Sequence, residues 1–322
     1  MNIIVVGAGV IGKERIKALE TLGENIIAVV DPALKGQKLL YDSNQKMAPI
    51  YHNIRDAYLA LPLLDDVWVF ICTPHHETIH VAEYYLDNGL NILVEKPLGR
   101  TIGEYKMILK HRDKEKINVG FNYRFFKGIK QLLQDVKDNI FGKLISVNMV
   151  LALGDPPGSE KTWRLDPKKS GRGAILDPGI HLIDLAMVMS DGTLKDAACK
   201  EWRGYWKTGI WEEAHLLATG NGVIYNIQSS VNRWRNTFRI EVNGTEGYGI
   251  VEGRNRHYGN QTYRRGKRYG WQSGKSQRES EELIIDYDGE DSFLEETHEV
   301  LYGTMAATHE DNWRCLKFID TL

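Results

Sequence analysis

The first third of the chain alternates short apolar runs with longer stretches in which apolar and polar positions follow a helical period. The apolar runs are typical of strands covered on both faces, and they lie at residues 3–6, 26–30, 67–72, 91–94 and 117–120. The stretches between them predict helices: one that begins near Val10, one at residues 51–61 with a cap at Asn53, one at 76–88 and one at 101–112. The polar segment from Pro32 to about Met47 is also predicted to be helical. Strands that alternate with helices indicate a parallel, doubly wound sheet.

This pattern changes beyond Gly120. After an amphipathic helix at residues 128–139, strand-like stretches dominate, at 144–153, 214–219, 222–231, 237–242 and 247–251. Their glycine-rich spacers are typical of hairpin turns, so this part predicts a mostly antiparallel open sheet with helices on one face. A long polar loop is expected at 253–280, and closing helices at 290–302 and 310–322. We therefore expect an α/β domain at residues 1–120 and an α+β domain at 121–322.

Composition narrows the class of protein. The chain has 322 residues, of which 42% are hydrophobic and 26% charged, as in an ordinary globular protein with room for two domains. A formal net charge of −2 argues against nucleic-acid binding. The three cysteines show neither metal-ligand spacing nor a disulfide framework, which favours a reducing compartment. With a strand at the very start and no apolar run long enough to span a membrane, we expect a cytoplasmic protein.

The first candidate for chemistry is the segment that follows the first strand. Gly7, Gly9 and Gly12 have the G-x-G-x-x-G spacing, and each has a physical purpose. The first allows a tight turn, the second lets the backbone approach a pyrophosphate, and the third lets the next helix pack on the strand. Asp31 ends the second strand, where a carboxylate can bind ribose hydroxyls. Together these residues predict a dinucleotide-binding Rossmann domain, with phosphates at the helix N-terminus.

Three further motifs follow in order. C-T-P-H at residues 72–75 and E-K-P at 95–97 each end a strand, and ligands bind at the carboxyl ends of parallel strands. The segment at 170–184 contains D-P-G-I-H-L-I-D. Its Asp177 and His181 are four residues apart, a spacing that places both on one face of a helical turn.

These four motifs together resemble the glucose–fructose oxidoreductase, inositol dehydrogenase and MocA family of NAD(P)-dependent dehydrogenases. The segment G-F-N-Y-R-F at 120–125 also looks like the family's domain-joining segment. The resemblance runs to about residue 184 and is topological beyond it. Three positions depart from the pattern: His75 and Thr78 stand where many relatives have asparagine and histidine, and Arg172 interrupts a run of glycines.

The resemblance implies that Lys96 is the active-site lysine, Asp177 an orienting acid and His181 the proton-transfer residue. Their chemistry agrees with this, because oxidation of an alcohol removes a hydroxyl proton as hydride leaves carbon. A neutral His181 can accept the proton, and the Lys96 ammonium can stabilise the developing negative charge. No metal is expected, because an organic cofactor takes the hydride.

The expected cofactor is NAD rather than NADP, because the Asp31 carboxylate would repel a 2′-phosphate, although Lys35 could soften this. The residues expected at the cofactor are Gly7, Gly9, Val10, Ile11, Gly12, Asp31, Thr73, Pro74, His75, Glu95, Lys96, Asn122, Arg124 and Trp163. Those expected at the substrate are Lys96, Arg124, Arg164, Arg172, Asp177 and His181.

The substrate is expected to be a sugar, and the basic residues before Asp177, above all Arg172, favour an anionic one such as a nucleotide-linked sugar. A second basic group at 254–278 includes aromatic residues that could stack on a base. The alternatives are a free-sugar or cyclitol dehydrogenase, an NAD-dependent glycoside hydrolase, and a non-catalytic sensor or repressor that binds dinucleotide. An open sheet face that needs a cover predicts a homodimer or homotetramer.

Overall fold

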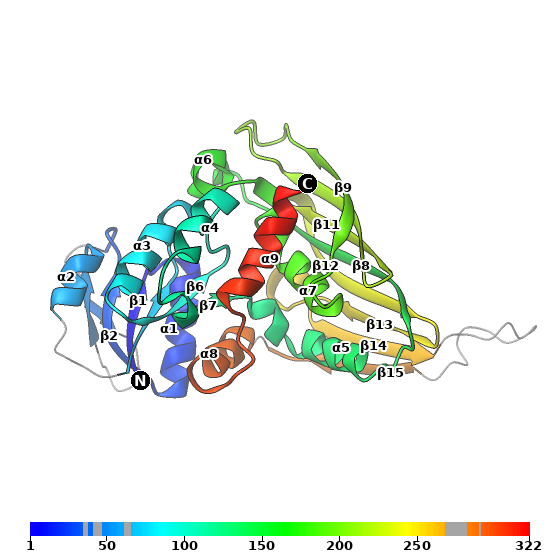
Figure 1. The fold of residues 1–322 in the computed structure, drawn as a ribbon, viewed down its shortest axis with the longest axis horizontal. Helices are drawn as coiled ribbons and strands as arrows, with labels where there is room; N and C mark the ends of the chain where they lie inside the picture. Colours follow the sequence, from blue (N-terminus) through cyan, green and yellow to red (C-terminus); the bar gives the residue numbers. More distant parts are fainter. Residues whose placement is uncertain (35–37, 41–46, 61–65, 268–281, 290) are drawn as a thin grey trace, which may run out of the picture. The chain divides into compact units, whose positions relative to one another are not determined.

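A computed structural model describes residues 1–34, 38–40, 47–60, 66–267, 282–289 and 291–322. They form two compact units, each built on its own sheet (Figure 1). Unit 1 comprises Met1–Asn122, Lys168–Gly171 and Phe293–Leu316, and unit 2 comprises Tyr123–Pro167, Arg172–Ser292 and Lys317–Leu322. Each unit is thus assembled from segments that are distant in the sequence.

Unit 1 contains a seven-stranded sheet in the order β3-β4-β2-β1-β5-β6-β7. Only β3 is antiparallel to its neighbour, so the predicted parallel, doubly wound sheet is confirmed. The strands are β1 (Asn2–Val6), β2 (Asn25–Val30), β3 (Lys38–Leu40), β4 (Met47–Tyr51), β5 (Val67–Ile71), β6 (Asn91–Glu95) and β7 (Ile117–Gly120). The helices that lie wholly or mostly in unit 1 are α1 (Val10–Leu22), α2 (Ile54–Leu59), α3 (His75–Asp87), α4 (Ile102–Leu109), α8 (Ser292–Tyr302) and α9 (His309–Asp320).

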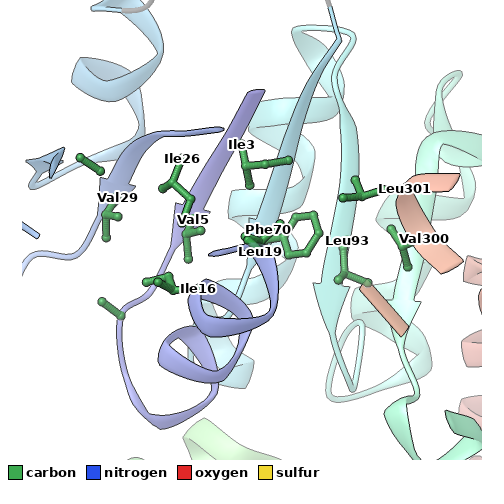
Figure 2. Close-up of a cluster of buried hydrophobic side chains, with 12 residues drawn as sticks. Ile3, Val5, Ile16, Leu19, Ile26, Val29, Phe70, Leu93, Val300 and Leu301 are labelled. Carbon is green, nitrogen blue, oxygen red and sulfur yellow. The ribbon is translucent and has the colours of Figure 1, made fainter. Parts of the chain in front are cut away.

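The apolar core of unit 1 joins the sheet to a helix from the far end of the chain. Ile3 and Val5 of β1 are fully buried and pack with Leu19 of α1 (Figure 2). Val300 and Leu301 of α8 belong to the same cluster. The helix α8, the last but one helix described, is therefore part of the core of unit 1.

A buried ion-pair cluster also fastens α8 to this unit. Arg15 of α1 is fully buried, and its Nε donates to Oε1 of Glu95 at the end of β6, 2.8 Å away. Its guanidinium also pairs with Glu296 of α8 and donates to the hydroxyl of Thr297 at 3.3 Å. Burial by itself lowers the pKa of Arg15, but the charges of Glu95 and Glu296 outweigh it and raise that pKa. The guanidinium thus stays charged in the core.

Unit 2 contains an eight-stranded sheet in the order β15-β14-β13-β12-β8-β11-β10-β9. Only β8 and β11 pair in parallel, so the predicted, mostly antiparallel sheet is confirmed. The strands are β8 (Leu144–Gly154), β9 (Lys195–Trp202), β10 (Glu213–Gly220), β11 (Val223–Ser230), β12 (Asn232–Gly244), β13 (Gly247–Glu252), β14 (Gln261–Lys267) and β15 (Glu282–Tyr287).

Helices pack on one face of this second sheet. The helix α5 (Lys127–Lys137) contacts β13, β14 and β15, and α7 (Ile180–Met189) contacts β8 and β11 (Figure 1). Alternate residues such as Val147 and Tyr225 are buried on that face. The other face carries half-buried polar residues such as Asn148 and Asn226. The short helix α6 (Pro167–Ser170) lies between β8 and α7 in the sequence.

Two local predictions are wrong where the structure describes them. The segment after Pro32 contains β3, and Met47 begins β4, which pairs with the open edge of β2. The predicted loop at 253–280 contains β14, whose residues Gln261 and Tyr263 point into the core. The residues that alternate with them along β14, such as Thr262 and Arg264, are polar, so the sequence of this strand resembles that of a loop. Residues 35–37, 41–46 and 268–281 lie outside the described residues.

Replacing Arg15 by methionine would leave the buried carboxylate of Glu296 and the half-buried carboxylate of Glu95 without their shared cation. Removal of one partner from a buried ion pair typically costs about 3–5 kcal/mol. We expect a loss of that size in the free energy of unfolding, measured by urea titration. Arg314→Met on α9 is the matched control, because its exposed pair with Glu310 should contribute about 0–1 kcal/mol. Equal losses in the two variants would contradict the role assigned to the cluster.

Candidate functional site

The glycine-rich turn of unit 1 is shaped by close backbone contacts. Gly7 has a φ of +91°, and a Cβ there would lie 2.6 Å from the carbonyl oxygen of Cys72. A Cβ on Gly12 would lie 1.9 Å from the carbonyl oxygen of Gly7. Gly9 differs, because a Cβ there would meet no atom within 4 Å. The glycines at 7 and 12 are thus required by the fold, whereas the one at 9 leaves space open to a ligand.

The N-terminus of α1 is prepared for an anion. Gly9 caps it without a side-chain hydrogen bond, and its first turn has no acidic residue. The apolar side chains of Val10 and Ile11 are 74% and 37% exposed there. Asp31 lies beside the turn, because its Oδ2 accepts a hydrogen bond from the amide of Ala8 at 2.8 Å. A helix N-terminus next to a carboxylate suits a pyrophosphate and its ribose.

The next strand ends of unit 1 carry the other predicted residues. The Thr73 hydroxyl lies 3.4 Å from that of Thr78, and Pro74 caps α3. His75 is buried, and its Nδ1 donates to the carbonyl of Ser170 at 2.9 Å. This contact fixes the tautomer of the ring, because a carbonyl can only accept.

The E-K-P motif follows β6. Glu95 is held by Arg15, as described above, and Lys96 comes directly after it. Lys96 is partly exposed, and its peptide bond to Pro97 is cis. Asn122, the last residue of the first segment of unit 1, is buried.

In unit 2, Asp177 shares an arginine with a second acid. Nη2 of Arg164 donates to Oδ2 of Asp177 at 3.3 Å, and its Nη1 lies 3.7 Å from Oδ1 of Asp155. Asp155 follows β8 directly, and its Oδ2 is buried with no hydrogen-bond partner in the part of the chain that the structure describes. Burial raises the pKa of Asp155; Arg164 opposes this and Asp177 reinforces it. The charge of Asp177 in turn raises the pKa of Arg164 above its ordinary value.

His181 lies in the first turn of α7 against an aromatic ring. The rings of His181 and Tyr123 are stacked, with centroids 3.9 Å apart and an interplanar angle of 13°. One turn further along α7, buried Asp184 accepts two hydrogen bonds from Arg124, at 2.8 and 2.5 Å. Arg124 is thus fastened to the same helix as His181.

The remaining predicted residues also belong to unit 2. Trp163 and Arg164 lie on a single 3₁₀ turn, Trp163–Leu165. Arg172 pairs with Glu201 at 2.8 Å and donates to the carbonyl of Ile319 at 2.7 Å.

The predicted residues divide between the two units. Unit 1 contains the glycine-rich turn at residues 7–12, Asp31, residues 73–75, Glu95, Lys96 and Asn122. Unit 2 contains Arg124, Trp163, Arg164, Arg172, Asp177 and His181. Within unit 2, Asp177 and Arg164 are brought into contact. Sequence reasoning missed Asp155 and Tyr123. The signal for Asp155 was its position as an acid directly after a long strand. Tyr123 belongs to the G-F-N-Y-R-F segment, but it was given no role there. No cluster of three or more His, Cys, Asp or Glu able to hold a metal occurs among the residues described.

Two family models match the chain. Residues 1–123 match a family model described as an oxidoreductase family with an NAD-binding Rossmann fold, and residues 129–249 match the GFO/IDH/MocA C-terminal domain. The chain belongs to the GFO/IDH/MocA family. The resemblance inferred from the four motifs is confirmed.

Curated members of the family match part of the chain. Levoglucosan dehydrogenase from Pseudarthrobacter phenanthrenivorans is 26% identical over 197 residues, which is 58% of this chain and 50% of that protein. An inositol 2-dehydrogenase/D-chiro-inositol 3-dehydrogenase from Halalkalibacterium halodurans is 31% identical over 148 residues, 44% of this chain and 42% of that protein. The chain thus spans about half the length of the curated relatives it matches.

Solved structures share the fold over the whole chain. Levoglucosan dehydrogenase in complex with NADH has a TM-score of 0.81 at 17% identity, over 99% of this chain and 95% of that one. UDP-N-acetylglucosamine 3-dehydrogenase GnnA from Acidithiobacillus ferrooxidans has a TM-score of 0.76 at 16% identity, over 100% and 96%. KijD10, a 3-ketoreductase from Actinomadura kijaniata in complex with TDP-benzene and NADP, has 0.76 at 17%, also over 100% and 96%. Among the residues described, no helix is long and apolar enough to cross a membrane.

The contrast between Gly9 and Gly12 can be tested by adding a methyl group at each. Gly9→Ala should change the free energy of unfolding by no more than about 1 kcal/mol, because its Cβ has room. It should weaken NAD(H) binding by at least about tenfold, because the Cβ occupies the space that a pyrophosphate needs. Calorimetric titration measures the affinity.

Gly12→Ala provides the comparison. Its Cβ would overlap the carbonyl oxygen of Gly7, so this variant should lose about 1–3 kcal/mol of stability. An unchanged affinity in Gly9→Ala would show that the dinucleotide does not bind over this turn.

Proposed function

We propose that this protein is an NAD(H)-dependent oxidoreductase that transfers hydride between nicotinamide and a hydroxyl-bearing carbon of a sugar or cyclitol. The observation that carries the proposal is the open space at Gly9, at a helix N-terminus that has no side-chain cap and lies beside Asp31. Family membership and the names of the dehydrogenases that resemble the chain support it.

The residues present fit a dinucleotide. The α1 N-terminus would hold the pyrophosphate, and Asp31 would accept hydrogen bonds from the ribose hydroxyls. A 2′-phosphate would meet the Asp31 carboxylate, so we propose NAD(H) as the preferred cofactor. Thr73, Pro74 and His75 would flank the cofactor at the next strand end, because ligands bind at the carboxyl ends of parallel strands.

Three side chains would act on the substrate hydroxyl. In the oxidising direction, neutral His181 accepts the proton of the substrate hydroxyl. The hydrogen on the carbon that bears this hydroxyl leaves at the same time with its electron pair, as hydride. The Lys96 ammonium binds the hydroxyl oxygen and stabilises the negative charge that develops on it. Asp177, held by Arg164, would orient the substrate. Bound NAD⁺ supplies the hydride acceptor, and reduction reverses the proton and hydride transfers.

The charges of unit 2 favour a neutral substrate. Arg172 is compensated by Glu201, and Arg164 by Asp177 and Asp155. Neither arginine therefore presents an uncompensated charge for a phosphate. We propose a neutral sugar or cyclitol as the first candidate, with carboxylates accepting hydrogen bonds from its hydroxyls.

A nucleotide-linked sugar is the second candidate. The guanidinium of Arg254 lies 4.0 Å from the ring centroid of Tyr258, a pair that could meet a phosphate and a base. Two structures of the same fold support this candidate: a UDP-N-acetylglucosamine 3-dehydrogenase and a 3-ketoreductase in complex with TDP-benzene.

Two other readings are less well supported. A sensor or repressor would not need Lys96, Asp177 and His181, all of which are present. A glycoside hydrolase would return the hydride within each turnover, so steady NADH production from a free sugar separates it from a dehydrogenase. We also propose that a second copy covers the polar face of the sheet in unit 2, as a homodimer or homotetramer.

The assigned roles can be tested with Lys96→Met and His181→Asn. Each variant should lose about 10²–10⁴-fold in kcat, the typical contribution of a general acid or base. Each variant should keep the fold and still bind NAD(H), because neither change alters the glycine-rich turn. Near-normal turnover in either variant would show that the residue has another role.

The charge of the substrate can be tested by comparing kcat/KM for myo-inositol, levoglucosan and a UDP-linked sugar at low and high salt. We expect the neutral compounds to be preferred and their kcat/KM to be insensitive to salt, because screening acts on charged ligands. The UDP-sugar would replace them as the substrate if it were used at least about tenfold better and lost that advantage in high salt. Arg172→Ala should lower stability without a selective loss for the UDP-sugar.

A further inference from the structure

Tyr123 makes an unusually close contact with the candidate proton-transfer residue. The residue lies in the 3₁₀ helix Asn122–Phe125, and its ring is nearly parallel to the ring of His181 at 3.9 Å. Both side chains are buried, each with 5% of its surface exposed. Such a contact restricts the imidazole to one plane.

Other side chains hold the tyrosine ring in turn. Phe126 meets it edge to face with centroids 5.2 Å apart, and Phe238 of β12 does so at 5.8 Å. The guanidinium of Arg254, in the loop after β13, lies 5.4 Å from its centroid. The plane of the Tyr123 ring is therefore set by three elements of unit 2, and the plane of His181 follows from it.

We propose that Tyr123 is a positioning residue for His181, whose ring it holds in plane and whose protonated form it stabilises. The inference rests on the proposed function, in which His181 exchanges a proton with the substrate. The face of an aromatic ring carries negative charge and attracts a cation more strongly than a neutral ring. An imidazolium thus gains more from the stack than a neutral imidazole does.

The sign follows from that difference. Stabilising the imidazolium moves the titration of His181 to higher pH, and loss of the ring moves it to lower pH. Arg254 acts in the opposite direction, because its guanidinium also interacts with the Tyr123 ring and so weakens the attraction of that ring for the imidazolium. The acids that precede and follow His181 in this segment are paired, Asp177 with Arg164 and Asp184 with Arg124, and these pairs are the same in all the variants below.

The stack does not need the tyrosine hydroxyl. Tyr123→Phe keeps the ring and is the matched control, whereas Tyr123→Met fills much of the same space without an aromatic face. We expect the Met variant to titrate His181 about 0.4–1.5 pH units lower than wild type, and the Phe variant to match wild type.

The measurement is a pH titration of ¹³Cε1-labelled histidine by NMR, with the His181 signal assigned by its loss in His181→Asn. This readout needs no turnover, so it separates failure of this inference from failure of the proposed function. The acid limb of kcat/KM should show the same shift in the Met variant, with recovery in the Phe variant. A structural role alone would change the unfolding temperature and leave both profiles in place.

Two results would overturn the proposal: a His181 titration that does not move in Tyr123→Met, or one that moves equally in Tyr123→Phe. If the Met variant fails to fold, Arg254→Met provides a second test, because it removes the competing cation from the ring. His181 should then titrate at higher pH, and an unchanged titration would contradict the proposal.

Discussion

The buried guanidinium of Arg15 is the constraint on which the cofactor-binding unit depends. A charge without water is tolerable only beside opposite charges, so α1, β6 and α8 must meet where Arg15 finds Glu95 and Glu296. Glu95 immediately precedes Lys96. The pairing that closes the core of unit 1 therefore also fixes the strand end that carries the candidate catalytic lysine, and it makes a helix from the end of the chain part of that support.

In unit 2 the charged residues of the candidate site are also paired with opposite charges. Arg164 lies between Asp155 and Asp177, Arg124 is bound by Asp184, and Arg172 by Glu201. Such pairs orient carboxylates while leaving little net charge, which suits a substrate recognised through its hydroxyl groups.

Much of this protein could be predicted from patterns that local physics controls. Apolar runs, helix caps such as Asn53 and the spacing of Gly7, Gly9 and Gly12 predicted most elements of unit 1 and its fold class. The failures have one cause. The strands β3 and β4 are only three and five residues long, and β14 is mostly polar; each of them is a strand because it pairs with the edge of a neighbouring strand.

In the candidate site, too, some features follow from the sequence and others only from the tertiary structure. The sequence by itself determined which residue types are available, namely a lysine after a strand and an acid and a histidine four positions apart. Only the tertiary structure decided that Glu95 is bound by Arg15 and Arg172 by Glu201, that Asp155 shares Arg164 with Asp177, and that Tyr123 stacks on His181. The physical reason is that charge compensation and ring stacking act between residues far apart in the chain, so their partners exist only once the sheets and helices have packed.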